Sequence, residues 1–367
     1  MVMSRKIIET PGDGERPPAG QRDGRRDIKD LSKDELSEWM DRHGMEPYRA
    51  GQILKWIYSE QMDDFSRMTN LKKSLRALLD AHFVSDRLRL EKVRESGDGS
   101  KKFLFGLKDG NRVESVLIPG KNRYAVCVST QAGCAQGCRF CRTARSGLTR
   151  NLSAGEIVGQ VRDILNMPPP DFPIANVVMM GMGEPLANYG PAITALNVLT
   201  DPSEGLKFAP RKVTVSTSGV VPGIDDLGRD SRANLAVSLN ASDNPTRSML
   251  MPVNRKYPIE ALLEACRRYP LTPRRRITFE YILIRGVNDS DENARALSAL
   301  LSGVRSKINL IPFNVFPGSP FKRPDDSAIE RFREILVEKG HTAITRRSRG
   351  QDISAACGQL SADAAGS

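Results

Sequence analysis

The sequence predicts an α/β fold: a partial (β/α)6 barrel of parallel strands and helices, preceded by a small helical domain. From residue 124 onward, short apolar runs alternate with segments of helical periodicity, the pattern of repeated strand–helix units. Before residue 90, by contrast, apolar residues recur mainly at helical spacing. The chain has 367 residues, which is long enough for one large domain and a smaller one.

The first expected elements are helices, in an accessory domain that spans residues 28–90. The segment LSKDELSEWMDRHG opens with Ser32 and Glu35, which have the spacing of a capping box, and ends at Gly44. Two more amphipathic segments follow, RAGQILKWIYSE and NLKKSLRALLDAHF. Residues 1–27 are rich in Gly, Pro, Arg and Asp and too polar to bury a core, so we expect a disordered tail there.

A β-hairpin connector is expected next, over residues 91–120. The segment KKFLFGLKDGNRVESVLIP alternates apolar and polar residues around Asp109-Gly110, a pair favoured in tight hairpin turns. Residues 121–345 then form the barrel, whose six buried strands are expected in YAVCVST, NVVMMG, KVTVSTS, NLAVSLN, ITFEYILI and KINLIPFN. Helices are expected near 153–166, 189–200, 222–228, 258–269, 291–302 and 325–339.

Polar residues follow several of these strands at the point where each strand ends. A cysteine cluster follows the first strand, and the glycine-rich segment GMGEPLAN follows the second. Ser216, Ser238, Asn240 and Asn314 stand at the ends of the third, fourth and sixth strands. Because the carboxyl ends of parallel strands open on one side of a barrel, these groups are expected to form a single site.

The charge of the chain bears on its partners. A net charge of +11 and a pI near 9.5 favour a polyanionic partner, with RNA or DNA the leading candidate over a merely basic surface. No apolar run approaches the roughly 20 residues of a membrane span, and the polar N-terminus lacks a signal-peptide pattern, so a cytoplasmic protein is expected. The candidate phosphate contacts, for which a solvated surface is an equal alternative, are Arg274, Arg275, Arg276, Arg346, Arg347 and Arg349.

Three of the six cysteines fall within the segment QAGCAQGCRFC, as Cys134, Cys138 and Cys141. Zinc commonly takes four ligands from two Cys-x-x-Cys pairs, and a second pair is missing. The three histidines lie far from the cluster in sequence and are expected at the surface or in the core: His43, His82 and His341. An iron–sulfur cubane fits better, since three thiolates leave one iron open to a non-protein ligand.

The spacing C-x-x-x-C-x-x-C, with Phe140 before its last cysteine, resembles the signature of the radical S-adenosylmethionine superfamily. The glycine-rich acidic turn GMGEP is a second match to that superfamily. The resemblance implies a radical-SAM barrel and a [4Fe-4S] cluster on Cys134, Cys138 and Cys141. It also implies that the open iron binds S-adenosylmethionine, which is cleaved reductively to a 5′-deoxyadenosyl radical.

A narrower resemblance extends from about residue 28 to residue 360. The segments CVSTQAGCAQGCRFCRTARSGLTRNLSAGEI, MGMGEPLAN, INLIPFNVFPGSPF and RGQDISAACGQL together resemble the dual-specificity RNA methyltransferase family. That family methylates C2 of adenine in 23S ribosomal RNA and in tRNA. Many members have histidine where this chain has Asn240, whose amide still offers a donor and an acceptor. The resemblance places S-adenosylmethionine contacts on Gly183, Glu184, Ser216, Ser238, Leu239, Asn240 and Asn314.

The same resemblance assigns chemistry to residues outside the cysteine cluster. It implies that Cys357, in the C-terminal segment 346–367, carries a methyl group taken from one S-adenosylmethionine, while a second one supplies the radical. Cys127 then matches the thiol that resolves the protein–RNA adduct, and Glu114 matches a proton acceptor. By composition alone both cysteines would be read as core residues, and Cys266, on the apolar face of a helix, is assigned to packing only.

The resemblance further implies a low-potential electron donor such as a flavodoxin, no membrane attachment and a monomer. Two other interpretations stay open at this point. One is a related enzyme that methylates C8 of the same adenine, because the cysteines would serve both reactions equally. The other is a non-catalytic RNA-binding protein stabilised by zinc.

Overall fold

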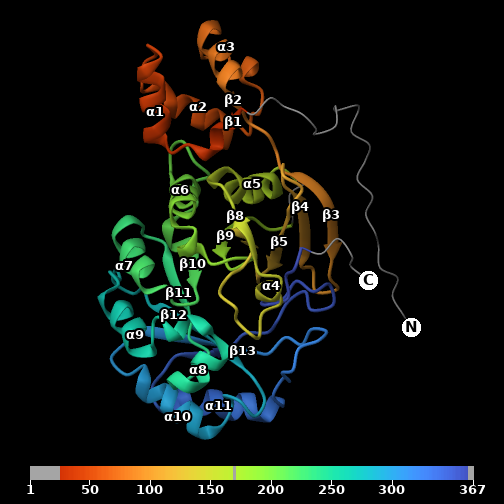
Figure 1. Cartoon of the computed structure of the whole chain (residues 1–367), viewed down its shortest axis with the longest axis vertical. Helices are drawn as coiled ribbons and strands as arrows, with labels where there is room; N and C mark the ends of the chain where they lie inside the picture. Colours follow the sequence, from red (N-terminus) through yellow and green to blue (C-terminus); the bar gives the residue numbers. More distant parts are fainter. Residues whose placement is uncertain (1–24, 168–170, 363–367) are drawn as a thin grey trace, which may run out of the picture.

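The computed structural model describes residues 25–167 and 171–362, so most of the tail expected at 1–27 lies outside the described residues. A ten-stranded sheet occupies the middle of the molecule (Figure 1). From one edge to the other it runs through β14 (Ala343–Thr345), β13 (Ser306–Pro312), β12 (Ile277–Leu283), β11 (Asn234–Ser238), β10 (Val213–Thr217), β9 (Ile174–Met179), β6 (Tyr124–Cys127), β5 (Arg112–Pro119), β4 (Lys101–Gly106) and β3 (Arg89–Glu95).

The strands from β14 to β6 are all parallel, and they include the six strands that the sequence predicts. The predicted α/β class is confirmed, with β14 as an additional short strand. At the other edge, β3, β4 and β5 are antiparallel, and β5 pairs with β6 so that Val116 lies opposite Cys127. The segment expected as a hairpin connector therefore continues the main sheet, and it has an extra strand, β3.

Helices flank the parallel strands, and six of them fall where the sequence predicts helices. They are α5 (Ala154–Leu165), α6 (Tyr189–Thr200), α7 (Val221–Asp230), α9 (Ile259–Arg268), α10 (Asp291–Leu300) and α11 (Asp326–Glu338). Apart from β3, the elements that were not predicted are short. Besides β14 they include α4 (Arg142–Arg145), α8 (Asn244–Leu250), the strand pair β7 (Gln131–Gly133) and β8 (Leu148–Asn151), and the 3-10 helices η1 (Ile28–Asp30), η2 (Phe65–Arg67), η3 (Pro185–Ala187), η4 (Pro210–Lys212) and η5 (Pro252–Arg255).

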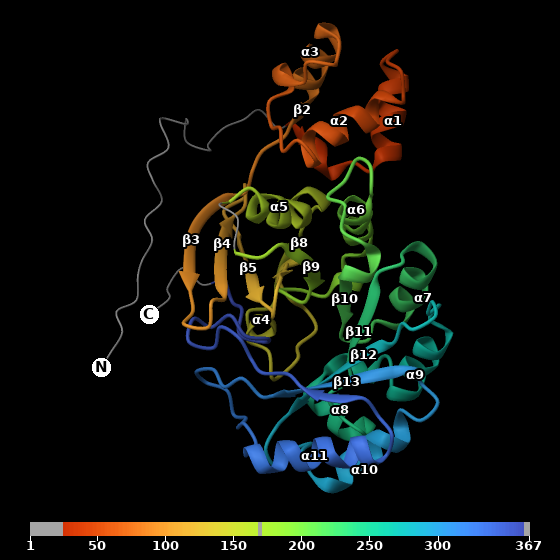
Figure 2. The same ribbon diagram turned by 180° about the vertical axis from the view of Figure 1, so that it is seen from behind.

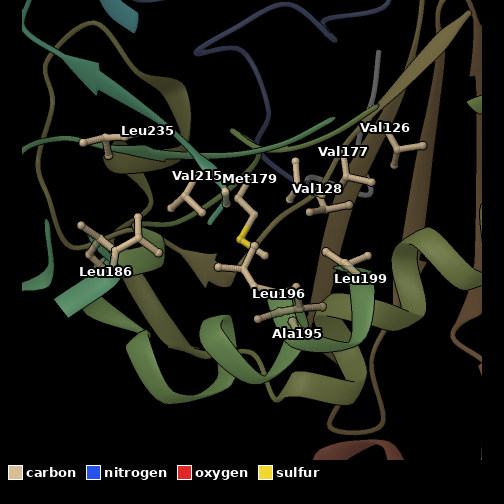
Figure 3. Close-up of a cluster of buried hydrophobic side chains, with 14 of the residues drawn as sticks. Val126, Val128, Val177, Met179, Leu186, Ala195, Leu196, Leu199, Val215 and Leu235 are labelled. Carbon is tan, nitrogen blue, oxygen red and sulfur yellow. The ribbon is translucent and has the colours of Figure 1, made fainter. Parts of the chain in front are cut away.

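The main core lies between the sheet and its helices. In Figure 3, Leu196 and Leu199 of α6 point towards Val177 and Met179 of β9. All four side chains are at most 1% exposed. Full burial of each such side chain contributes about 1.5–3 kcal/mol. This packing holds the strands rigidly enough that their carboxyl ends can position functional groups.

The N-terminal domain contains α1 (Lys33–Arg42), α2 (Arg49–Tyr58) and α3 (Lys73–His82), closed by the parallel pair β1 (Arg26–Asp27) and β2 (Phe83–Val84). The predicted capping box is present, with the Ser32 hydroxyl accepting from the Glu35 amide at 3.2 Å. Figures 1 and 2 show this domain at one end of the molecule, beside α5. The fully buried Arg162 of α5 donates to the Ile57 carbonyl at 2.9 Å and pairs with Asp63, which ties the domain to the barrel. Along the described chain, no helix combines the length and apolarity needed to cross a bilayer.

Candidate active site

A cavity of about 370 Å³ lies at the carboxyl ends of the parallel strands, within the usual size range of small-molecule sites. It is bounded by the loops after β6, β9, β10 and β11 and by the C-terminal segment. The sequence-predicted residues that line it are Cys127, Cys134, Cys138, Cys141, Gly183, Glu184, Ser216, Ser238, Asn240 and Cys357. The expected convergence of strand ends on one site is thus observed, whereas Glu114, Leu239 and Asn314 lie behind the cavity wall.

The cysteine loop is shaped by local backbone hydrogen bonds. The Cys134 amide donates to the Gly147 carbonyl at 2.7 Å, and the Cys141 amide donates to the Cys138 carbonyl at 3.1 Å. Gly133 has a φ of +81°, and a Cβ there would lie 2.0 Å from the Gly147 oxygen, so only glycine permits this approach. The loop thus presents its three thiols to one cavity.

The electrostatics of these thiols suit a metal cluster. Burial raises the pKa of Cys134 to about 12 and raises the pKa of Cys138 well above its usual range, and the neighbouring cysteines add to both shifts. Positive iron would offset that cost, since metal ligands must be deprotonated. Among the described residues, no three His, Cys, Asp or Glu side chains surround the position of a single ion. Three cysteines suit a [4Fe-4S] cluster, which would leave one iron open to a non-protein ligand, better than a structural zinc site, which commonly takes four protein ligands.

The GMGEP turn brings a carboxylate to the cavity. Glu184 is 3% exposed, and its two oxygens accept from the Ser218 amide at 2.6 Å and the Leu186 amide at 3.1 Å. Burial raises the pKa of Glu184. A Cβ on Gly183, whose φ is +103°, would lie 2.6 Å from the Gln131 Cβ, so the tight turn requires glycine. A carboxylate has about four acceptor positions, so Glu184 keeps capacity for an ammonium group.

The residues after β11, which the sequence predicts to contact the cofactor, are instead hydrogen-bonded within the protein. Asn240 has a φ of +58°, a conformation that asparagine tolerates. Its side-chain oxygen accepts from the Ile282 amide at 2.8 Å, and its NH₂ group donates to the Met251 sulfur at 3.2 Å. The amide expected to contact the cofactor is therefore bound within the protein, although Asn240 borders the cavity. Leu239 is fully buried and is held by its backbone, whose amide donates to the Glu280 carbonyl at 3.0 Å.

The cavity brings together two further cysteines that are distant in sequence. Cys127 ends β6, and Cys357 comes from the C-terminal segment. Burial raises the pKa of Cys127 to about 12, and burial also raises the pKa of Cys357, against the opposing effect of the Arg346 guanidinium. All six cysteines of the chain are free, so in this state no disulfide joins Cys127 to Cys357.

Asn314 and Glu114 contact the C-terminal segment instead of lining the cavity. The Asn314 side chain donates to the Cys357 carbonyl at 3.1 Å and accepts from the Gln351 side chain at 2.8 Å. Glu114 is 4% exposed, pairs with Lys102 at 2.9 Å and accepts from the Ser361 amide at 3.0 Å. Both residues thus help to hold Cys357 in place.

Sequence reasoning did not find Glu280 as a site residue. Glu280 lies in β12, is 5% exposed and lines the cavity. One of its oxygens accepts from the Asn309 side chain at 3.0 Å, and the other has no hydrogen-bond partner within the described chain. A charged residue inside the buried run ITFEYILI was the available signal.

The two basic runs lie at opposite ends of the sheet. Arg346, Arg347 and Arg349 line the cavity, and Cys357 is the main cause of the raised pKa of Arg346. Residues 274–276 directly precede β12 and so lie at its amino end, away from this cavity, and their contact with RNA stays a prediction. Parallel strands carry their active groups at the carboxyl ends.

Known proteins share this architecture. Residues 26–84 match the family model described as the ribosomal RNA large subunit methyltransferase N-terminal domain, and residues 128–297 match the radical SAM superfamily model. The dual-specificity RNA methyltransferase RlmN of Desulfosudis oleivorans is 53% identical over 338 residues, which covers 92% of this chain and 91% of the relative. That of Syntrophotalea carbinolica is 51% identical over 339 residues, covering 92% and 90% respectively.

A solved structure extends the similarity to three dimensions. The crystal structure of a radical SAM methyltransferase from Sphaerobacter thermophilus matches with a TM-score of 0.84 and 46% sequence identity. The match covers 92% of this chain and 100% of that chain. With this fold, this set of cysteines in one cavity and this degree of identity, the chain belongs to the dual-specificity RNA methyltransferase family of the radical SAM superfamily.

Proposed function

We propose that this chain methylates C2 of adenine in 23S ribosomal RNA and in tRNA, using two molecules of S-adenosylmethionine per turnover. The observation that carries this proposal is the meeting of Cys127 and Cys357 in the cavity that the three cluster cysteines also line. When bound to those three cysteines, a [4Fe-4S] cluster supplies the electron for reductive cleavage of S-adenosylmethionine.

The target carbon explains why thiols are needed. C2 of adenine lies between two ring nitrogens and is electron-poor, so it does not attack a methyl sulfonium directly. The Cys357 thiolate takes the methyl group from one S-adenosylmethionine, and this S-methyl group then loses a hydrogen atom to the adenosyl radical. The resulting methylene radical bonds to C2 and joins the protein to the RNA. This adduct then loses the C2 proton and one electron, which the oxidised cluster would take back, while the bond to the protein stays intact. The Cys127 thiolate then attacks the Cys357 sulfur and forms a disulfide. The bond from that sulfur to the methylene carbon breaks, and the carbon takes up a proton, which releases the methylated RNA.

Other residues in the cavity and behind its wall bind the reactants or accept a proton. Glu184 accepts the α-ammonium group of S-adenosylmethionine through a charge-assisted hydrogen bond. Glu114 accepts the C2 proton, which requires the C-terminal segment at Ser361 to move, because Glu114 contacts that segment and does not line the cavity. Arg347 and Arg349 contact RNA phosphates at the mouth of the cavity. We also propose that the protein is a cytoplasmic monomer and that it receives electrons from a flavodoxin-like donor.

The decisive test is the fate of RNA in two variants. Cys127→Ala retains the methyl carrier but lacks the resolving thiol, so labelled RNA should accumulate as a covalent adduct through Cys357. Cys357→Ala should give neither an adduct nor methylated RNA. Cys266→Ala serves as the matched control, because this thiol is buried in the main core outside the cavity. Denaturing gels followed by peptide mass spectrometry would show the adduct, and normal release of methylated RNA by Cys127→Ala would refute the assignment.

Mass spectrometry of the product also distinguishes the related reaction. The same two cysteines would serve methylation at C8, and the residues of the cavity do not by themselves separate the two carbons. Mapping of the methyl group on adenine in RNA from cells with and without this chain decides between them. A methyl group at C8 would replace the proposed target while leaving the thiol chemistry intact.

A further inference from the structure

A buried ion pair lies directly beneath the C-terminal segment. Lys102 of β4 and Glu114 of β5 are 2.9 Å apart, with side chains only 9% and 5% exposed. The register pairs Lys102 with Val116 and Leu104 with Glu114, so the two charges are diagonal neighbours on one face of the sheet. Burying two charges has a large desolvation cost unless further hydrogen bonds satisfy the groups.

Those further hydrogen bonds reach both sides of Cys357. The Lys102 ammonium donates to the Ser354 carbonyl at 3.2 Å, and the Glu114 carboxylate accepts from the Ser361 amide at 3.0 Å. Ser354 precedes Cys357 by three residues and Ser361 follows it by four. Ser354 also has a φ of +54°, which is unfavourable for serine and has to be maintained by its surroundings.

The same part of the sheet holds the start of the segment. Asp98, in the turn between β3 and β4, accepts from the Gly350 amide at 2.9 Å. In return, Asp352 accepts from the Ser96 hydroxyl at 2.6 Å. The C-terminal segment therefore lies against the antiparallel strands and the turn between β3 and β4. Within this contact, the Lys102–Glu114 ion pair binds the segment on both sides of Cys357.

We propose that Lys102 and Glu114 form a positioning clamp that fixes Cys357 in the cavity. The inference rests on the proposed function in one respect, namely that Cys357 carries the methyl group. Lys102 does not line the cavity, so we assign it a positioning role. The ion pair binds the segment at Ser354 and at Ser361. These two contacts restrict the Cys357 sulfur to positions from which it reaches both the methyl donor and Cys127.

The test compares Lys102→Met with Lys101→Met. Lys101 is the adjacent residue of β4, and its ion pair with Glu95 is exposed, so it is a matched control. In Lys102→Met, amide hydrogen exchange over residues 350–361 should become about tenfold faster or more while β5 stays protected. Methylation of Cys357 by S-adenosylmethionine, followed by mass spectrometry, should slow by about tenfold as well. Lys102→Arg should restore part of both properties, and Lys101→Met should match the parent.

Ser361→Pro provides a second variant, since it removes the amide that Glu114 binds and leaves the ion pair unchanged. It should loosen the segment in the same way. Unchanged exchange over 350–361 in both variants would overturn the clamp, and so would a loss of protection spread evenly over the whole sheet. A loosened segment with the methyl group found on a residue other than Cys357 would support the clamp and refute the proposed function.

Discussion

Two segments bring cysteines to the cavity, and they are built in different ways. The loop with Cys134, Cys138 and Cys141 is shaped by hydrogen bonds to its own neighbours in the chain, such as that from Cys134 to Gly147. The segment around Cys357 has local hydrogen bonds too, such as that from Ala355 to Gly350. In addition, residues distant in sequence bind it: Asn314, the Lys102–Glu114 pair and Arg142, whose amide donates to the Gly358 carbonyl at 2.7 Å. The cysteine loop is thus encoded largely by residues nearby in sequence, whereas the position of Cys357 also depends on contacts from residues far away in sequence.

The largest loss of activity is expected from substitutions in the loop that contains Cys134, Cys138 and Cys141. Replacing Cys134, Cys138 or Cys141 by alanine removes one of only three protein ligands, so cluster assembly and production of the adenosyl radical should both be abolished. Iron and sulfide content, the absorption spectrum and release of 5′-deoxyadenosine measure this directly after anaerobic reconstitution. A variant that retained a full cubane and cleaved S-adenosylmethionine at the parental rate would contradict the assignment.

The same contrast explains what the sequence could predict. The six buried strand runs are local patterns, and they predicted their strands. The spacing of the three cysteines is local too; these residues line one cavity, and their role as cluster ligands stays a prediction. The strand β14 has three residues, and β3 contains only exposed and half-buried positions, so neither has a long apolar run. The partners of Glu114 could not be predicted, because the hairpin pattern does not show that Lys102 is buried beside it or that Ser361 returns to it.

The second effect concerns the pH dependence of methyl transfer to Cys357. Burial holds the pKa of this thiol above its usual range, so at pH 7 most of it is protonated. The reactive thiolate then increases about tenfold per pH unit below that pKa, so the single-turnover methylation rate should rise about a hundredfold from pH 7 to 9. Mass spectrometry of the Cys357 peptide follows the rate. A flat profile would show that the thiol is already ionised at pH 7.

A smaller effect is expected for Asn314→Ala, which removes two hydrogen bonds on the Cys357 side of the cavity. Methylation of Cys357 should slow by about tenfold, because the segment samples more positions, while the iron content stays unchanged. The Michaelis constant for S-adenosylmethionine separates the two roles of this residue. A large rise in that constant with an unaltered segment would identify Asn314 as a cofactor contact and not a holder of Cys357.

The smallest effect on activity is expected from replacing Cys266, which belongs to neither segment. Cys266 lies in α9, is 2% exposed and packs in the main core with Leu262 and Leu263. Cys266→Ala removes one sulfur from a well-packed site, so the free energy of unfolding should fall by about 1 kcal/mol. RNA methylation and cluster content should stay at the parental level, because no atom of this residue borders the cavity. Denaturant unfolding and a turnover assay on the same preparation measure both, and a stable but inactive variant would reveal a third functional thiol outside both segments.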